Sequence, residues 1–179
     1  MKMKSLIMPV VAIGLSALIL LGASMGLSAA AGAKEEQARY DLMCRLLSGS
    51  TSFEEEVYES EDEAIRAVYK GENGYVIETS TYGYVGDVVM LIGVDNSGCV
   101  TGLTVLDLAE TYGLGARALS DMDFMGQFVG TAGEAEIGTT VDAMTGATVT
   151  SKAITKGVNA ASAYVTGADT SSGATEWGG

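Results

Sequence analysis

The stretch DAMTGAT at residues 142–148 places hydroxyl groups and small residues directly before a predicted helix over 149–165. Unpaired backbone N–H groups and the positive end of the helix dipole make such a helix N-terminus a binding site for anions. Gly146 and Ala147 carry little side-chain bulk, so a phosphate or another protein can approach the backbone. Lys152, one turn into the helix, adds a positive charge. The pattern indicates a phosphate seat.

Simpler interpretations exist for each segment. Thr145 or Thr148 can act as an ordinary helix cap with no ligand. A second glycine-rich segment, Glu110–Gly115 (ETYGLG), follows a predicted strand, and the glycines on both sides of Leu114 permit a close approach to a planar ligand. Alone, that segment favours a tight turn.

Taken together, the two segments are much more specific. Residues 142–148 resemble the flavinylation motif D-x-x-[ST]-G-A-T of a family that includes the G subunit of the Rnf electron-transport complex and the C subunit of the sodium-pumping NADH:quinone reductase. Residues 110–115 resemble the E-T-P-G-L-G segment that lies against the flavin in that family. The resemblance extends over residues 5–165, through YGYVG at 82–86 and the hairpin at 94–102.

The resemblance implies one covalent FMN, joined through its phosphate to the Thr148 hydroxyl. A separate magnesium-dependent flavin transferase would move FMN from FAD onto this residue, and would recognise Asp142, Gly146 and Ala147. No metal site is expected on the chain itself. The implied cofactor-binding residues are Thr148, Asp142, Thr145, Gly146, Ala147, Glu110, Thr111, Gly113, Leu114 and Gly115.

The chain departs from the family pattern at two places. Tyr112 stands where the family has proline, so the loop loses a φ constraint and gains an aromatic ring. Residues 107–109 lack a histidine that often precedes the Glu-Thr pair. The short length favours the Rnf-type subunit over the longer quinone-reductase subunit.

For function, the resemblance implies an electron-carrier subunit of a membrane complex that couples electron transfer between ferredoxin and NAD to ion movement. The sequence has no iron–sulfur cysteine pattern and no NAD fingerprint, so it is expected to hold no complete active site alone. Other subunits would supply those centres. Two alternatives stay open: a free-standing flavoprotein that passes electrons to an external acceptor, and a colourless module that binds an anionic ligand.

The first residues predict a membrane anchor. Residues 5–33 contain 29 uncharged, mostly apolar positions, more than the roughly 20 that a transmembrane helix needs. Lys2 and Lys4 precede this run, which places the N-terminus in the cytoplasm and the remainder on the extracytoplasmic side. The alternative is a signal peptide cleaved near the small residues 31–33, although the run exceeds the usual apolar length.

The composition excludes several classes of site and partner. Apart from the two lysines of the N-terminus, the chain has 8 Lys+Arg (10 minus those two) against 23 Asp+Glu, a net charge of −15. Such a surface repels phosphate backbones, which excludes nucleic acid as a partner. There is no histidine, and Cys44 and Cys99 lie 55 residues apart, so a zinc or iron–sulfur site is not expected. A disulfide and two free thiols are both compatible with their spacing.

Hydrophobic periodicity predicts an α+β domain with an antiparallel sheet and helices packed against it. An amphipathic helix is expected over 34–48 and a short helix over 118–129. Strands are expected at residues 64–70, 76–79, 87–94 and 99–106, with a hairpin turn at 95–98. The predicted parts are an anchor at 1–33, a connector at 34–52, an FMN-binding domain at 53–166 and a flexible tail at 167–179.

Overall fold

The computed structural model describes residues 32, 34–58, 62–108 and 121–168. The described residues fall into two compact units, one that ends at Leu42 and one that begins at Met43. In the first unit, helical residues include Gln37, whose Nε2 donates to Asp41 Oδ1 at 3.0 Å. The helix predicted over 34–48 is confirmed over 34–46.

Among the described residues, none of the helices has the length and apolar character needed to cross a membrane. The anchor predicted at residues 1–33 lies almost entirely outside the described residues, and so does most of the predicted tail. The predicted domain boundaries stay predictions.

The second unit is built on a five-stranded sheet. The strands are β1 (Glu54–Glu56), β2 (Ile65–Lys70), β3 (Gly74–Tyr82), β4 (Asp87–Asp95) and β5 (Val100–Leu108). They lie in the order β1-β2-β3-β4-β5, and each pairs antiparallel with its neighbour in the chain. The predicted antiparallel sheet is therefore confirmed.

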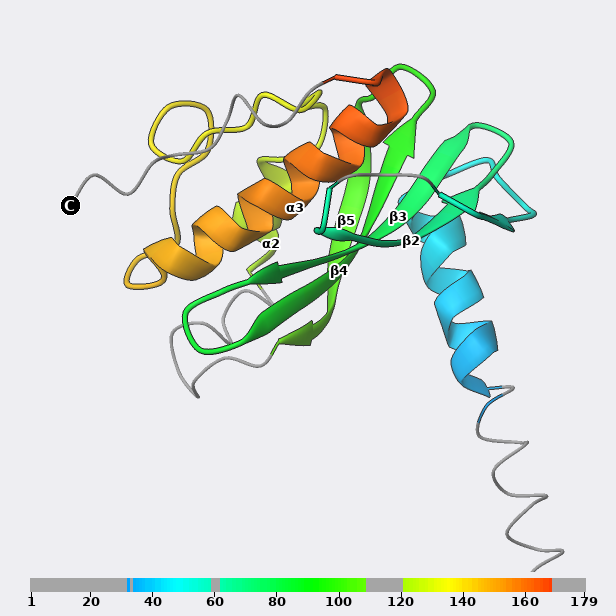
Figure 1. The fold of residues 1–179 in the computed structure, drawn as a ribbon, viewed down its shortest axis with the longest axis horizontal. Coiled ribbons are helices and arrows are strands. Elements are labelled where there is room, and N and C mark those ends of the chain that lie inside the picture. The colour runs from blue at the N-terminus through cyan, green and yellow to red at the C-terminus, as the bar shows by residue number, and fades with distance from the viewer. Residues whose placement is uncertain (1–31, 33, 59–61, 109–120, 169–179) are drawn as a thin grey trace, which may run out of the picture. The chain divides into compact units, whose positions relative to one another are not determined.

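Two helices cover one face of this sheet (Figure 1). They are α2 (Met122–Gly126) and α3 (Thr148–Thr166). The core between them and the sheet consists of buried apolar side chains from both layers, including Ile77, Val88, Met90, Ile92, Val94, Phe124, Phe128, Ile154 and Val158. Burial of such side chains is worth roughly 1.5–3 kcal/mol each, which makes this layer the main source of stability.

The other face of the sheet carries a smaller cluster. Its buried members are Met43, Leu46, Leu47, Val76 and Leu91. The Leu46 carbonyl accepts a hydrogen bond of 2.5 Å from Thr101 Oγ1. Gly93 permits this approach, because a Cβ there would stand 2.5 Å from the Leu46 carbonyl oxygen. Cys44 and Cys99 are both free thiols.

Helix α3 runs antiparallel to β3 across the sheet. Thr81 Oγ1, near the end of β3, donates to the Ala153 carbonyl at 2.9 Å, whereas Ser162, near the end of α3, bonds to Gly98 in the β4–β5 turn. Gly157 allows α3 to pack closely on the sheet: a Cβ there would lie 2.5 Å from Met90 Cε on β4 and 2.8 Å from Thr79 Oγ1 on β3.

The start of α3, the β3–β4 hairpin and the end of β5 therefore lie at one end of the domain (Figure 1). We call this the Thr148 end; it comprises residues 82–87, Leu108 and Thr148. The opposite end holds the β2–β3 and β4–β5 turns, around Glu72 and Ser97.

Candidate functional site

Thr148 is the first residue of α3 and is exposed. Ala147 is the N-cap, with φ −130° and ψ 41°, and no side chain caps the helix. Capping of α3 by Thr145 or Thr148, the simpler interpretation of the motif, is therefore wrong. Within the described residues the Thr148 hydroxyl takes part in no hydrogen bond, so its oxygen is available for chemistry.

The backbone at the start of α3 offers unpaired donors. Ser151 N donates to the Ala147 carbonyl at 2.9 Å and closes the first turn. Among the described residues, no hydrogen bond engages the N–H groups of Thr148, Val149 or Thr150. These groups and the helix dipole favour a negatively charged ligand at this position, such as a phosphate.

The loop in front of Thr148 turns sharply at Gly146. This residue has φ +79°, a left-handed conformation that glycine adopts without steric cost. Ala147 N closes the turn by donating to the Met144 carbonyl at 3.0 Å. The side chains of Met144 and Ala147 are buried, whereas Thr145 is exposed. The buried apolar side chains thus anchor the loop, and its polar side chains are exposed to solvent.

Side chains from both helices hold the backbone of this loop. Ser151 Oγ accepts from Met144 N at 3.0 Å and donates to the Ala147 carbonyl at 2.9 Å. Gln127, at the end of α2, uses both atoms of its amide on the backbone of Asp142: Asp142 N donates to Oε1 at 2.8 Å, and Nε2 donates to the Asp142 carbonyl at 3.4 Å. The Asp142 side chain itself is exposed.

Neither Gln127 nor Ser151 is among the site residues predicted from the sequence. Gln127 bonds to a backbone 15 residues away, for which the sequence gives no signal. Ser151 lies three residues after Thr148 on the first turn of a helix, where a buried hydroxyl could have been suspected because serine readily bonds to nearby backbone groups.

The structure brings five of the predicted site residues together, and leaves five outside the described part. The five that lie together, in the loop and at the first position of α3, are Asp142, Thr145, Gly146, Ala147 and Thr148. Those outside the described residues are Glu110, Thr111, Gly113, Leu114 and Gly115. Their segment begins two residues after Leu108, where β5 ends at the Thr148 end.

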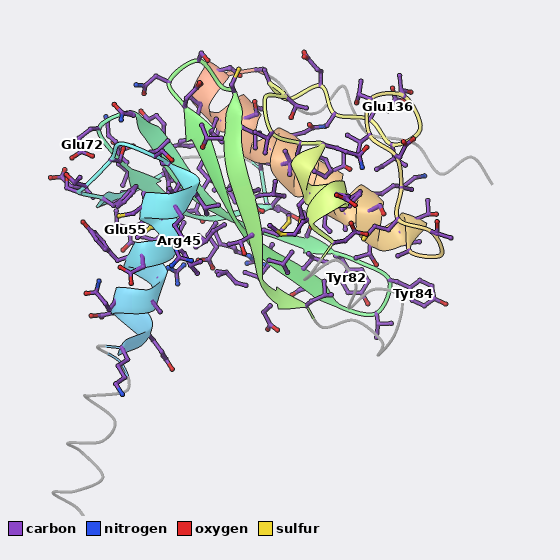
Figure 2. The ribbon with its side chains drawn as sticks, turned by 180° about the vertical axis from the view of Figure 1, so that it is seen from behind. Arg45, Glu55, Glu72, Tyr82, Tyr84 and Glu136 are labelled. Carbon is purple, nitrogen blue, oxygen red and sulfur yellow. The ribbon has the colours of Figure 1, made fainter. Side chains whose placement is uncertain are left out.

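The β3–β4 hairpin adds exposed aromatic groups to the Thr148 end. Tyr82 and Tyr84 are each 71% exposed and Val85 is 50% exposed. Figure 2 shows both tyrosines at the β3–β4 hairpin, at the opposite end of the sheet from Glu72. Tyr82 Oη donates to the Val85 carbonyl at 3.3 Å, which ties the tip together. Large apolar side chains gathered on a surface are typical of binding sites.

Residues 83–163 match the FMN-binding domain family. The matched range begins in the β3–β4 hairpin, contains Thr148 and ends near the end of α3. The predicted resemblance is confirmed. The family's ligand is a flavin with a terminal phosphate, and the Thr148 end combines a helix start whose first N–H groups are unpaired among the described residues with exposed aromatic side chains, so the residues present fit FMN.

Curated relatives point the same way. The chain is 39% identical over 113 residues to the G subunit of the Na⁺-translocating ferredoxin:NAD⁺ oxidoreductase complex of Acetobacterium woodii, covering 54% of each protein. It is 39% identical over 99 residues to the G subunit of the proton-translocating ferredoxin:NAD⁺ oxidoreductase complex of Clostridium ljungdahlii, covering 51% of this chain and 53% of that one.

A third relative is also named as a G subunit. The chain is 35% identical over 97 residues to the G subunit of the ion-translocating oxidoreductase complex of Methanosarcina acetivorans, covering 51% of each protein. The alignments thus span about half the length of the relatives that the chain matches.

Proposed function

We propose that this chain is the electron-carrying subunit of an Rnf-type, ion-translocating ferredoxin:NAD oxidoreductase complex, with one FMN joined through its phosphate to Thr148. The observation that carries the proposal is the exposed Thr148 hydroxyl, which has no hydrogen-bond partner in the described part and stands on a helix start without a side-chain cap. This residue lies inside the range that matches the FMN-binding domain family.

The attachment reaction needs an exposed hydroxyl and an outside catalyst. A magnesium-dependent flavin transferase would use FAD as the donor: a bond forms between Thr148 Oγ and the phosphorus of the FMN half, the pyrophosphate bond breaks, and AMP leaves. The hydroxyl proton passes to a base of the transferase. The exposure of Thr148 and Asp142 supports this reaction, because an enzyme must reach both residues on the folded chain.

Several residues of this chain would hold the attached group. The free N–H groups at the start of α3 would face the phosphodiester charge, with Lys152 one turn away. Tyr82 and Tyr84 supply aromatic surface at the same end for a planar ring. Bound FMN supplies one- and two-electron transfer, and the surrounding protein sets its potential.

The relatives are named as subunits of ion-translocating oxidoreductase complexes. By that similarity, this chain would pass electrons between other membrane-bound redox subunits, which carry the ferredoxin- and NAD-reactive centres. A membrane segment in residues 1–33 would hold the chain at the extracytoplasmic face.

An intact-mass measurement with peptide mapping tests the covalent flavin. The protein is purified from a membrane whose host has the transferase, beside the Thr148→Val variant. We expect the wild type to carry the added mass of one FMN less one water on the peptide that contains Thr148, and the variant to carry none. An unmodified wild type would contradict the proposal. Co-purification of other redox subunits distinguishes the complex subunit from a free-standing flavoprotein.

A further inference from the structure

The connection between α2 and α3 runs from Gln127 to Ala147 with no helix and only one isolated bridge, between Ile137 and Val141. Irregular connections longer than about 12–15 residues are uncommon in compact domains, because their backbone groups need partners and their order costs entropy. Some backbone groups of this loop pair with other backbone groups, and others obtain their partners from side chains.

Two side-chain amides hold the loop in the same manner. Gln127 bonds to both backbone groups of Asp142, as described above. Asn159, on α3, bonds to both backbone groups of Ala135: Nδ2 donates to the carbonyl at 2.8 Å, and Ala135 N donates to Oδ1 at 3.1 Å. Both amides are half-buried. Only the Gln127 clamp touches the motif that ends at Thr148.

Gln127 is itself firmly placed. It follows α2 directly, and its N–H donates to the Phe124 carbonyl at 3.2 Å. The rings of Phe124 and Phe128, on either side of it in the chain, are buried and pack edge-to-face with centroids 5.2 Å apart. The clamp therefore links the backbone of Asp142 to the core of the domain.

Resting on the proposed function, we propose that Gln127 is a positioning residue for flavin attachment. Its amide fixes the backbone of Asp142, while Ser151 fixes Met144 and Ala147. The motif is thereby held at three backbone positions, and its exposed side chains are displayed to the transferase in one arrangement. Gln127 acts through Asp142 and does not touch the reacting oxygen.

The clamp lowers the entropy that the transferase must remove when it binds its protein substrate. Fixing the backbone of one residue costs free energy, and a substrate whose binding-competent conformation is only partly populated binds more weakly in proportion. Loss of the clamp should therefore raise the KM for the protein and leave kcat unchanged, since the acceptor hydroxyl is unaltered.

The test compares two variants that remove matched amide clamps without changing charge. Full-length apo-protein, Gln127→Met and Asn159→Leu are prepared in a host without the transferase. Each is then incubated with the purified transferase, Mg²⁺ and FAD, and initial rates of FMN attachment are measured against protein concentration. We expect Gln127→Met to raise the KM roughly tenfold at unchanged kcat, and Asn159→Leu to behave as the wild type.

Two controls keep the outcomes separate. Thermal unfolding shows whether the variants fold, and Gln127→Ala replaces Gln127→Met if the latter does not. Amide hydrogen exchange should accelerate at Asp142 in the Gln127 variant and at Ala135 in the Asn159 variant. A wild-type KM for a folded Gln127 variant, or an equal rise for Asn159→Leu, would overturn the positioning role alone. Absence of labelling on the wild type would overturn the proposed function, and this inference with it.

Discussion

At the end of the sheet that holds the β4–β5 turn, Asp95 Oδ1 accepts three hydrogen bonds: from Ser97 Oγ at 2.6 Å, Ser97 N at 2.8 Å and Cys99 N at 3.0 Å. At the Thr148 end, Asp142 and Thr148 are exposed, and their side-chain oxygens take part in no hydrogen bond among the described residues. Carboxylate and hydroxyl side chains thus stabilise a turn at one end of the sheet, whereas at the other end they are available to bind a ligand.

The β2–β3 turn contains the carboxylate with the most hydrogen bonds described here, that of Glu72. Glu72 accepts hydrogen bonds from the N–H and hydroxyl groups of Thr51 and Ser52, at 2.9–3.4 Å. Together with its own backbone N–H, the largest contribution, these bonds lower the pKa of Glu72 to about 2. By contrast, the exposed polar side chains of the Thr148 end add little stability themselves, because Gln127 and Ser151 hold the backbone there instead.

Removal of a structural hydroxyl should have the largest effect on stability. Ser162 is fully buried and donates to the Gly98 carbonyl at 2.5 Å. We expect Ser162→Ala to lower the free energy of unfolding by about 1–3 kcal/mol, since a buried acceptor loses its partner. Urea titration measures this change, and intact mass should show unchanged FMN loading. A change below about 0.5 kcal/mol would remove the contrast between the two ends.

A backbone change at the Thr148 end should have a smaller effect on stability. Gly146→Ala forces a side chain into the left-handed region, which costs about 1 kcal/mol. The turn before Thr148 should distort, so FMN attachment should slow as stability falls. Gly126→Ala is the matched control, because a Cβ there meets nothing within 4 Å and its φ is not positive. Equal stability and equal rates of FMN attachment in the two variants would show that neither property depends on the conformation of Gly146.

The stabilising effect of the Glu72 carboxylate, at the end of the sheet opposite Thr148, should depend on pH. The pKa of Glu72 is lowered from 4.5 to about 2, so its stabilising effect is present above the unfolded-state value and is lost as pH falls through about 2. We expect the urea midpoint of Glu72→Gln to lie below that of the wild type at pH 7, and the gap to vanish near pH 2. Glu55→Gln, at an exposed position on β1, is the control and should show no gap. A gap that persists near pH 2 would assign the effect to something other than this carboxylate.

Thr148→Val should have the smallest effect on stability. Its hydroxyl is exposed and does not cap α3, so we expect the free energy of unfolding to change by less than about 0.5 kcal/mol. This is smaller than the roughly 1 kcal/mol typical of a lost helix cap. Urea titration of apo-protein from a host without the transferase measures it. A larger loss would show a structural role for this threonine.

Runs of apolar and β-branched residues predicted the sheet, but not the full length of its strands. β3 was expected at residues 76–79 and extends from Gly74 to Tyr82. Ser80 and Thr81 interrupt the apolar pattern, yet both are buried. The Thr81 hydroxyl is satisfied there because it donates to the Ala153 carbonyl on α3. A partner 72 residues away cannot be read from local sequence.

The candidate site was predictable where its signal is a contiguous motif, and not where it depends on the fold. The last helix was expected from residue 149 and begins at Thr148, so the motif stands at its start as predicted. The amide of Gln127 became visible only in the structure, because the bond joins α2 to a loop. The role of residues 110–115 stays a prediction.

All pairings within the sheet join strands that are neighbours in the chain, so the meander can form from local contacts and should form early. Helix α3 comes from the far end of the described chain and must dock on β3 and β4 afterwards. Because Ser151 belongs to α3 and bonds to the backbone of Met144 and Ala147, the motif before Thr148 gains its shape only at that last step. We therefore expect flavin attachment to follow folding in time. The fraction of molecules that carry flavin in a preparation should then report the fraction that has completed folding.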